Sequence, residues 1–260
     1  MADFIRTSRD ERGVVTLRLA RPDKHNALSS QMMTELEAEA QTLAADATCR
    51  VVILAAEGPT FCAGGDLAWM RDQRGMDAAT RKRESRRIAT ALGALAELPQ
   101  PLIGRIHGNA FGGGVGLAAV CDVAIGVSGA KMGLTETRLG LLPANIGPYV
   151  IARMGAARAR EVFMNARIFE AEEAVRLNLL TRVVPPDALD AAVEAEVAPY
   201  LECAPGAVAA AKALLGDLAG RVGAAEVDMA IDALAARWET EEAAEGLDAF
   251  FEKRPPRWRG

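Results

Sequence analysis

Histidine and cysteine, the residues that most often bind transition metals in proteins, are scarce in this chain. Its 260 residues include two histidines and four cysteines, and the cysteines show neither a Cys-x-x-Cys motif nor the spacing of a zinc site. Neither Gly-x-Gly-x-x-Gly nor Gly-x-x-x-x-Gly-Lys-Ser/Thr occurs in the sequence. The sequence therefore predicts no structural metal site and no nucleotide-binding glycine loop.

An excess of positive charge is also lacking. Lys and Arg total 30 against 35 Asp and Glu, a formal net charge of −5, so the overall field attracts neither nucleic acid nor an anionic membrane. The N-terminus lacks the basic-then-apolar pattern of a secretory signal, and the run 110–127 is broken by glycines. We expect a cytoplasmic protein with free thiols and with no nucleic-acid or membrane partner. One basic cluster is interpreted as a solvated helix face, with contact to phosphate as the alternative: Arg81, Lys82, Arg83, Arg86 and Arg87.

Hydrophobic residues make up half of the chain and alternate between strand-like and helix-like patterns. Apolar, β-branched runs predict strands at 4–8, 14–19, 50–56, 102–106, 123–127, 132–134 and 181–184. Helical spacing and capping residues predict helices after Ser29 or Ser30, after Asp66, and over 76–98, 146–154, 156–166 and 169–176. Residues 189–253 are alanine-rich and helical in pattern. Together these patterns predict an α/β fold followed by a C-terminal helical region.

Two stretches share one order of elements, namely an apolar strand, a glycine-rich turn and a helix. The first contains Phe61-Cys62-Ala63-Gly64-Gly65-Asp66-Leu67, and the second passes through Gly112-Gly113-Gly114. The first turn of a helix has unpaired N–H groups and the positive end of the helix dipole, which favour an anion or a developing oxyanion. Two such turns either bring two backbone donors to one oxygen or have no common target, and the sequence leaves both possibilities open.

Glu136 lies between a short predicted strand and an apolar turn. Burial in such a place raises the pKa of a carboxyl group towards neutrality and suits it to proton transfer at carbon. A surface or capping glutamate is the alternative interpretation of the same pattern.

Five stretches, taken in order, resemble the crotonase superfamily of enoyl-CoA hydratases and isomerases, and together they span nearly the whole chain. They are Arg21-Pro22 with Asn26-Ala27-Leu28; Phe61 to Leu67; His107 to Gly114 through Cys121-Asp122; Gly133-Leu134-Thr135-Glu136 with Leu139 to Pro143; and Phe251-Glu252-Lys253-Arg254.

The resemblance implies a repeated ββα spiral core, placed at residues 1–198, and a C-terminal α-helical region at 199–260 that covers the CoA site and makes subunit contacts. It also implies a homotrimer or a homohexamer built as a dimer of trimers. The substrate would be an acyl-CoA thioester, with coenzyme A as part of the substrate rather than a cofactor and with no metal.

The resemblance further implies an oxyanion hole made by the N–H groups of Ala63 and Gly113, with Glu136 as the group that moves the proton. The residues that match the family's CoA-binding positions are Lys24, His25, Ala27, Leu28, Gly64, Gly65, Asp66, Leu67 and Lys253.

One position departs from the family pattern. Typical hydratases carry two glutamates, of which the second matches Glu136 while the first falls at Gly116. The stretch after Glu136 resembles hydratases of branched or glutaconyl-type enoyl-CoA esters, and hydration of a 2-enoyl-CoA is the favoured function. A Δ3,Δ2-enoyl-CoA isomerase with a single glutamate and a CoA-ester-binding protein with little turnover are the alternatives. If only an acid is missing, Gly116→Glu is expected to raise hydration.

Overall fold

A six-stranded sheet forms the centre of the computed structural model, which describes residues 4–219 and 223–256. Its strands lie in the order β1-β2-β3-β4-β6-β9. β1 is antiparallel to β2, and the other neighbours are parallel. The α/β prediction and the strands predicted for this sheet are confirmed: β1 (Ile5–Arg9), β2 (Val14–Leu19), β3 (Val51–Ala56), β4 (Leu102–Ile106), β6 (Val123–Val127) and β9 (Arg182–Val184).

A second, three-stranded sheet has the order β5-β7-β8, with β5 (Ala110–Phe111), β7 (Lys131–Gly133) and β8 (Ile168–Glu170). β7 was predicted, whereas β5 and β8 were not. The predicted helix at 169–176 is wrong for its first two residues, which belong to β8, and α6 (Ala171–Arg176) begins only after them. Strands of two or three residues show no usable periodicity, because their partner strand decides their conformation.

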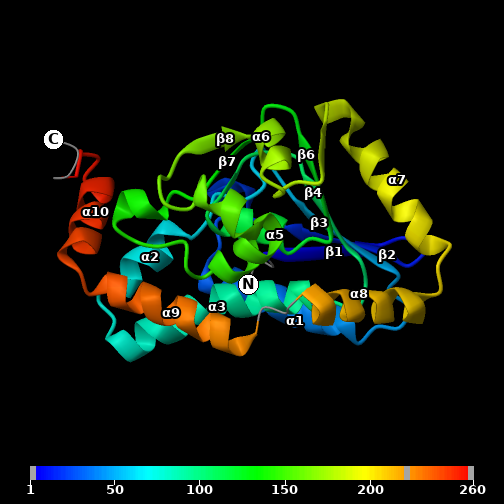
Figure 1. Ribbon diagram of the computed structural model, residues 1–260, viewed down its shortest axis with the longest axis horizontal. Coiled ribbons are helices and arrows are strands. Elements are labelled where there is room, and N and C mark those ends of the chain that lie inside the picture. The colour runs from blue at the N-terminus through cyan, green and yellow to red at the C-terminus, as the bar shows by residue number, and fades with distance from the viewer. Residues whose placement is uncertain (1–3, 220–222, 257–260) are drawn as a thin grey trace.

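Two long helices, α1 (Ser30–Ala44) and α3 (Ala78–Ala96), pack against each other along one face of the large sheet (Figure 1). Ser29 caps α1, since its Oγ accepts a hydrogen bond from the N–H of Met32 at 3.3 Å. The apolar side of α1 is buried as its spacing predicted, through Met32, Met33, Leu36, Ala40 and Leu43.

Three further helices stand around the glycine-rich turns: α2 (Leu67–Gln73), α4 (Gly113–Ala119) and α5 (Gly147–Arg160). α5 joins the two helices predicted at 146–154 and 156–166, with a kink at Gly155 where φ is 75° and ψ is 151°. It ends at Arg160, six residues before the predicted end. Short 3₁₀ turns complete this part of the chain: η1 (Pro22–Lys24), η2 (Glu136–Leu139) and η3 (Pro186–Ala188).

The C-terminal part is helical, as predicted, with α7 (Leu189–Leu201), α8 (Pro205–Ala219), α9 (Ala224–Trp238) and α10 (Glu241–Phe251). The boundary expected between residues 198 and 199 falls inside α7, because Pro199 lies within this helix rather than ending it. The break expected at Gly220 lies outside the described residues. α9 packs along α3, and α10 packs against η2 at one end of the molecule (Figure 1). Within 4–219 and 223–256, no helix has the length and apolar character needed to span a membrane.

The basic cluster of α3 holds α9 in place. Arg81 pairs with Glu239, Lys82 with Asp232 and Arg86 with Asp228. Arg81 is buried, with 7% of its surface exposed, and its guanidinium donates hydrogen bonds to the carbonyls of Gln73 at 3.0 Å and Met76 at 2.7 Å. The interpretation of this cluster as a solvated helix face is therefore wrong for Arg81, whereas the Lys82 and Arg86 side chains remain 42% and 38% exposed within their pairs.

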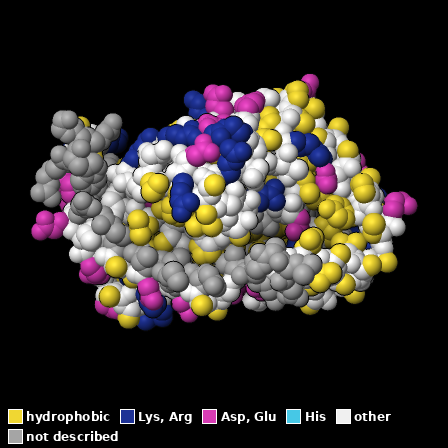
Figure 2. Space-filling view, in the orientation of Figure 1, with side chains coloured by type: hydrophobic (Ala, Val, Ile, Leu, Met, Phe, Trp, Pro, Cys, Tyr) yellow, Lys and Arg dark blue, Asp and Glu magenta, His cyan; other side chains and the backbone are white. Residues whose placement is uncertain are grey.

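A second group of charges lies over α6 and β8, where Figure 2 shows basic and acidic side chains together. Arg167 pairs with Glu173 at 2.7 Å, and Arg176 pairs with Glu161 and Glu173, also at 2.7 Å. The hydrogen bonds from these two arginines lower the pKa of Glu173 to about 2. These arginines are thus paired within the chain.

Candidate active site

The three chain segments singled out in the sequence run side by side. Cys62 forms a parallel bridge with Ala110, in which the N–H of Phe111 donates to the Cys62 carbonyl at 2.9 Å. Ala110 in turn pairs in parallel with Met132. Because parallel segments end at the same edge, the residues that follow them emerge together. These residues are the turn at 63–66, the turn at 112–113 and Glu136.

The two glycine turns and the carboxyl group of Glu136 lie within contact distance of one another. Gly64 has a φ of 94° and Gly112 a φ of 47°, conformations that residues with a Cβ rarely adopt. A Cβ placed on Gly64 would lie 3.0 Å from the Phe111 carbonyl oxygen, and one placed on Gly112 would lie 2.9 Å from Glu136 Oε1. Glycine at these positions therefore permits the close approach that brings both turns to the carboxyl group.

The backbone donors at this site differ in part from those expected. The N–H of Ala63 donates to the His25 carbonyl at 3.0 Å, so this amide is already paired and the prediction that Ala63 contributes to an oxyanion hole is wrong.

Two neighbouring amides remain as donors. Leu28 forms a parallel bridge with Gly65: its N–H donates to the Gly64 carbonyl at 2.7 Å, and its carbonyl accepts from the Asp66 N–H at 3.0 Å. The N–H of Gly65 itself therefore points away from Leu28. Gly113 is the first residue of α4 and has no intrahelical acceptor for its N–H. No described residue accepts a hydrogen bond from either amide. Sequence reasoning missed Gly65 as a donor because the bridge to Leu28, distant in sequence, decides which amide is turned outward.

Glu136 is the titratable group of the site. Its Oε2 is buried and has no hydrogen-bond partner among the described residues. Burial raises the pKa of Glu136 from 4.5 to about 7, and a hydrogen bond from its own backbone amide opposes this only in part. Close to neutral pH the carboxyl group can therefore both accept and donate a proton, and the interpretation of Glu136 as a surface or capping residue is wrong.

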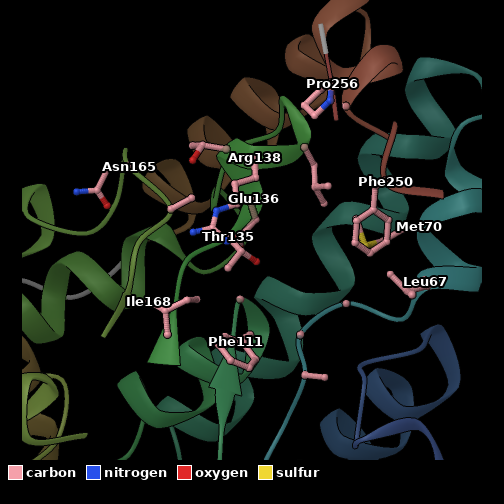
Figure 3. A pocket seen from close by; sticks show the side chains of 18 of the residues that line it. Leu67, Met70, Phe111, Thr135, Glu136, Arg138, Asn165, Ile168, Phe250 and Pro256 are labelled. Atoms are coloured by element: carbon pink, nitrogen blue, oxygen red, sulfur yellow. The ribbon is translucent and has the colours of Figure 1, made fainter. Parts of the chain in front are cut away.

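Two cavities meet around this carboxyl group. The larger has a volume of about 900 Å³, the smaller about 80 Å³, and Gly65, Met70 and Glu136 line both. Figure 3 shows Glu136 in the lining of the larger cavity, with Leu67, Met70 and Phe250 to one side and Asn165 and Ile168 to the other. The smaller cavity is bordered by α2, α3, α9 and the segment before α5, through Trp69, Gln73, Ser85, Ile88, Gly113, Leu141, Leu142, Pro143, Ala144, Asn145, Ile146, Leu234 and Trp238.

Of the residues predicted to bind CoA, Gly64, Gly65 and Leu67 line the larger cavity. Asp66 does not. Its Oδ1 caps α2 by accepting hydrogen bonds from Ala68 at 2.8 Å and Trp69 at 3.0 Å, and its Oδ2 pairs with Arg21 at 2.6 Å. Burial by itself raises the pKa of Asp66, but the Trp69 amide and Arg21 outweigh it and the pKa lies below its ordinary value. The capping role predicted for Asp66 is confirmed.

The remaining predicted CoA-binding residues lie outside the lining of either cavity. Lys24, His25 and Lys253 are exposed, the last of them just after α10, whereas Ala27 and Leu28 are buried. Leu28 supports the site from beneath, since its Cδ1 would lie 2.6 Å from a Cβ on Gly113.

Sequence reasoning missed two cationic residues in the larger cavity, Arg138 and Arg254. Arg254 follows directly after the predicted Lys253 and pairs with Glu245 at 2.7 Å. Arg138 has no ion pair with any described residue. In the sequence, Arg254 belongs to the last of the resembling stretches and Arg138 lies between the two parts of another, and neither carried a further signal.

At Gly116 the structure has no vacant place for a first glutamate. A Cβ at this position would lie 2.6 Å from Ile146 Cγ2 and 2.9 Å from Leu92 Cδ1. The expectation that Gly116→Glu restores a missing acid is therefore not supported, because apolar side chains occupy the space. Glu136 is the one acidic residue among the described residues that line the two cavities.

Comparisons with known proteins agree with this site. The family model described as enoyl-CoA hydratase/isomerase matches residues 9–260. The mitochondrial methylglutaconyl-CoA hydratase of Mus musculus is 34% identical over 268 residues, which cover 96% of this chain and 81% of that protein. An enoyl-CoA hydratase of Mycobacterium smegmatis has a crystal structure that matches with a TM-score of 0.81 and 35% identity over all of both chains.

A further crystal structure, of an enoyl-CoA hydratase from Mycobacterium avium, matches with a TM-score of 0.88 and 30% identity over 99% of this chain and 100% of that one. These similarities extend over the sheet, both glycine turns and the C-terminal helices. The chain therefore belongs to the enoyl-CoA hydratase/isomerase (crotonase) family and is an enzyme that acts as a hydratase or an isomerase of enoyl-CoA thioesters.

Proposed function

We propose that this enzyme hydrates a 2-enoyl-CoA thioester. The thioester oxygen lies between the N–H groups of Gly65 and Gly113, where negative charge develops as water adds to C3. The Glu136 carboxylate takes a proton from that water, and the resulting carboxyl group gives a proton to C2. The product is a 3-hydroxyacyl-CoA. This chemistry calls for no cofactor, since CoA is part of the substrate.

The observation that carries this proposal is the position of Glu136. Its Oε2 is buried without a partner among the described residues, next to two unpaired amides, and burial sets the pKa near 7. A group that must both take and give a proton works best when its pKa lies near the working pH. The larger cavity, of about 900 Å³, is the proposed place of the CoA ester, and Glu136 lines both this cavity and the smaller one.

An isomerase is the second candidate, and one observation favours it. Because Gly116 has no side chain and Ile146 fills the adjoining space, Glu136 is the one carboxyl group in the described lining of the two cavities. A single base can move a proton from C2 of a 3-enoyl-CoA to C4 without water.

The acyl group of the proposed substrate carries a carboxylate. The likeness to a methylglutaconyl-CoA hydratase and the unpaired Arg138 in the larger cavity support a substrate with an acyl carboxylate. Arg138→Gln is then expected to raise KM for a glutaconyl-type ester more than for crotonyl-CoA. Equal increases would instead assign Arg138 to the CoA phosphates, which both substrates carry.

One experiment separates these functions. The enzyme is incubated with 2-enoyl-, 3-enoyl- and glutaconyl-type CoA esters, and the products are separated by chromatography, which distinguishes 2-enoyl from 3-enoyl isomers, and then identified by mass. A gain of 18 Da, the mass of one water, identifies hydration. Conversion of the 3-enoyl ester into its 2-enoyl isomer with no change of mass, and no addition of water to any ester, would establish the isomerase instead.

A further inference from the structure

The small cavity contains an unusual concentration of unpaired polar atoms. In the part of the chain that the structure describes, five side-chain nitrogen or oxygen atoms are buried without a hydrogen-bond partner. Three of them belong to residues that line the cavity of about 80 Å³: Glu136 Oε2, Asn145 Oδ1 and Trp238 Nε1. Buried polar atoms in folded proteins are almost always hydrogen-bonded, so these three atoms point to a polar guest that they share.

The three groups are complementary as partners for one water molecule. The indole N–H of Trp238 donates only, while the amide oxygen of Asn145 and the carboxylate of Glu136 accept. A buried water commonly makes about three hydrogen bonds, and the volume exceeds the roughly 10–15 Å³ that one water requires. Two other polar residues line the cavity, but they bond to each other, since Ser85 Oγ donates to Gln73 Oε1 at 3.4 Å. Most of the remaining lining side chains, such as Leu141 and Ile146, are apolar. The few polar partners therefore determine where a water binds.

The position of Asn145 is tied to the departure at Gly116. Asn145 directly precedes Ile146, whose side chain fills the space where the side chain of a residue at 116 would begin. The segment that removes the room for a first glutamate thus also brings an amide into the cavity.

Trp238, which also lines the small cavity, is held by a buried arginine. The guanidinium of Arg81 lies 5.5 Å from the centre of its ring, and that guanidinium is fixed by its hydrogen bonds to the carbonyls of Gln73 and Met76. The contact with Arg81 therefore fixes the position of the Trp238 indole at the cavity.

We propose that Asn145 and Trp238 bind the water that adds to the substrate, in place of the missing first glutamate. This inference rests on the hydratase function proposed above. The water oxygen accepts a hydrogen bond from Trp238 Nε1–H, and its two hydrogens go to Asn145 Oδ1 and Glu136 Oε2. Its remaining lone pair faces C3 of the 2-enoyl thioester.

The step balances with the groups named. A bond forms between the water oxygen and C3 while the C2–C3 double bond opens and its electrons move to the thioester oxygen. The water proton bound to Glu136 transfers to the carboxylate. When the enolate collapses, the carboxyl group delivers a proton to C2, and Glu136 returns to its ionised form.

The test measures two reactions in the same variants. Asn145→Ala and Trp238→Phe are expected to lower kcat for hydration at least tenfold with KM changed less than threefold. Exchange of the C2 proton of a saturated acyl-CoA with D₂O needs Glu136 and the backbone N–H groups of Gly65 and Gly113, but it needs no bound water. It is expected to stay within twofold of the wild type in both variants.

A matched control is Tyr149→Phe. Tyr149 lies in the same stretch of chain, and its buried hydroxyl donates to the Ala89 carbonyl at 2.7 Å, but it lines neither cavity. Loss of this hydroxyl removes a buried hydrogen bond without touching the proposed water site, so hydration and exchange are both expected to stay near wild-type levels.

Asn145→Asp provides an independent readout. A carboxylate that shares a water with Glu136 disfavours ionisation of its neighbour, so the rising limb of the pH–rate profile is expected to shift to higher pH. An unshifted profile would place residue 145 too far from Glu136 for the shared water.

The outcomes separate the two proposals. If the wild type adds water and both variants hydrate at the wild-type rate, or if hydration and exchange fall equally, the water site is wrong while the hydratase function stands. If the wild type adds water to no ester and only isomerises, both proposals fail.

Discussion

Glu136 is the residue on which the proposed chemistry depends, because it combines a buried, unpaired oxygen, a raised pKa and proximity to both glycine turns. Glu136→Gln preserves the shape of the side chain but cannot take up a proton. We expect kcat to fall about 10²–10⁴-fold, the usual contribution of general acid–base catalysis, with binding of the CoA ester nearly unchanged. Steady-state kinetics and calorimetric titration with a saturated acyl-CoA measure the two effects. Activity near the wild-type level would assign the proton transfer to another group.

The raised pKa of Glu136 predicts the pH dependence of the enzyme. Ionised carboxylate is needed to accept the water proton, so kcat/KM is expected to rise with pH up to about 7 and then to level off. A profile measured at constant ionic strength from pH 5 to 9 tests this. A rate that is flat between pH 5 and 7 would show that this carboxyl group is not the one that titrates.

The same pKa has a consequence for stability. Because the folded-state pKa lies above the unfolded value, protonated Glu136 favours the folded state, and this contribution is lost as pH rises from about 4.5 through about 7. Denaturant midpoints of wild type and Glu136→Gln are therefore expected to diverge over this range, in favour of the variant. If the midpoints of the two proteins changed equally with pH, the Glu136 carboxylate would not be buried as a charge in the folded state.

How far the sequence could predict the site differs from residue to residue. The raised pKa of Glu136 and the capping role of Asp66 were predicted, because each depends on near neighbours in the chain, a short strand in one case and a helix start in the other. The CoA-binding role expected for Asp66 could not be judged from neighbours alone, and Asp66 lies outside the lining of both cavities. Gly65 was missed because its N–H is turned outward by a bridge to Leu28, 37 positions earlier. Backbone donors carry no side-chain signal, so only the pairing pattern of the folded chain identifies them.

Among the elements, those long enough to show a period were predicted, and those that depend on a distant partner were not. α1 buries the residues that its spacing indicated, and β3, a continuous apolar run, lies in the middle of a parallel sheet as such runs do. β5 consists of two residues and exists because β7 lies beside it. The charges of α3 were interpreted as solvated because α9, which pairs with them, is 130 residues away or more.

The contact between α3 and α9 yields a prediction about two neighbouring cations. Arg81 is buried, bonds two carbonyls and lies over the Trp238 ring, whereas Lys82 makes only an exposed pair with Asp232. Arg81→Met is expected to lower the free energy of unfolding by about 1–3 kcal/mol, because it leaves buried carbonyls unpaired. Lys82→Met, the matched control on the same helix, is expected to cost about 1 kcal/mol at most.

Urea unfolding followed by circular dichroism measures both changes. Arg81→Met is also expected to lower kcat, because Trp238 loses its support at the small cavity. Equal and small effects of the two variants would show that α9 is held to α3 by its apolar contacts and not by the buried arginine.

At the scale of the whole molecule, the large exposed apolar side chains of the described residues, apart from Ile151 on α5, fall into two groups. Leu67, Met164, Ile168 and Phe250 are exposed but line the larger cavity, where the substrate is expected to cover them. The adjacent Leu214 and Leu215 on α8 are 56% and 68% exposed and line neither cavity. Exposed apolar groups away from a ligand site commonly mark contacts between subunits.

The proposal of a homotrimer or homohexamer can be tested on α8. Leu214→Glu combined with Leu215→Glu buries two charges in any interface formed there, and the molar mass from light scattering is expected to fall towards that of one chain. Ile151→Glu on α5 introduces the same charge at a side chain that is 43% exposed, and the mass is expected to stay unchanged. A smaller assembly in the α5 variant alone would move the interface to α5. A wild type that is monomeric at all concentrations would contradict the oligomer itself, and the exposed pair on α8 would then need another partner.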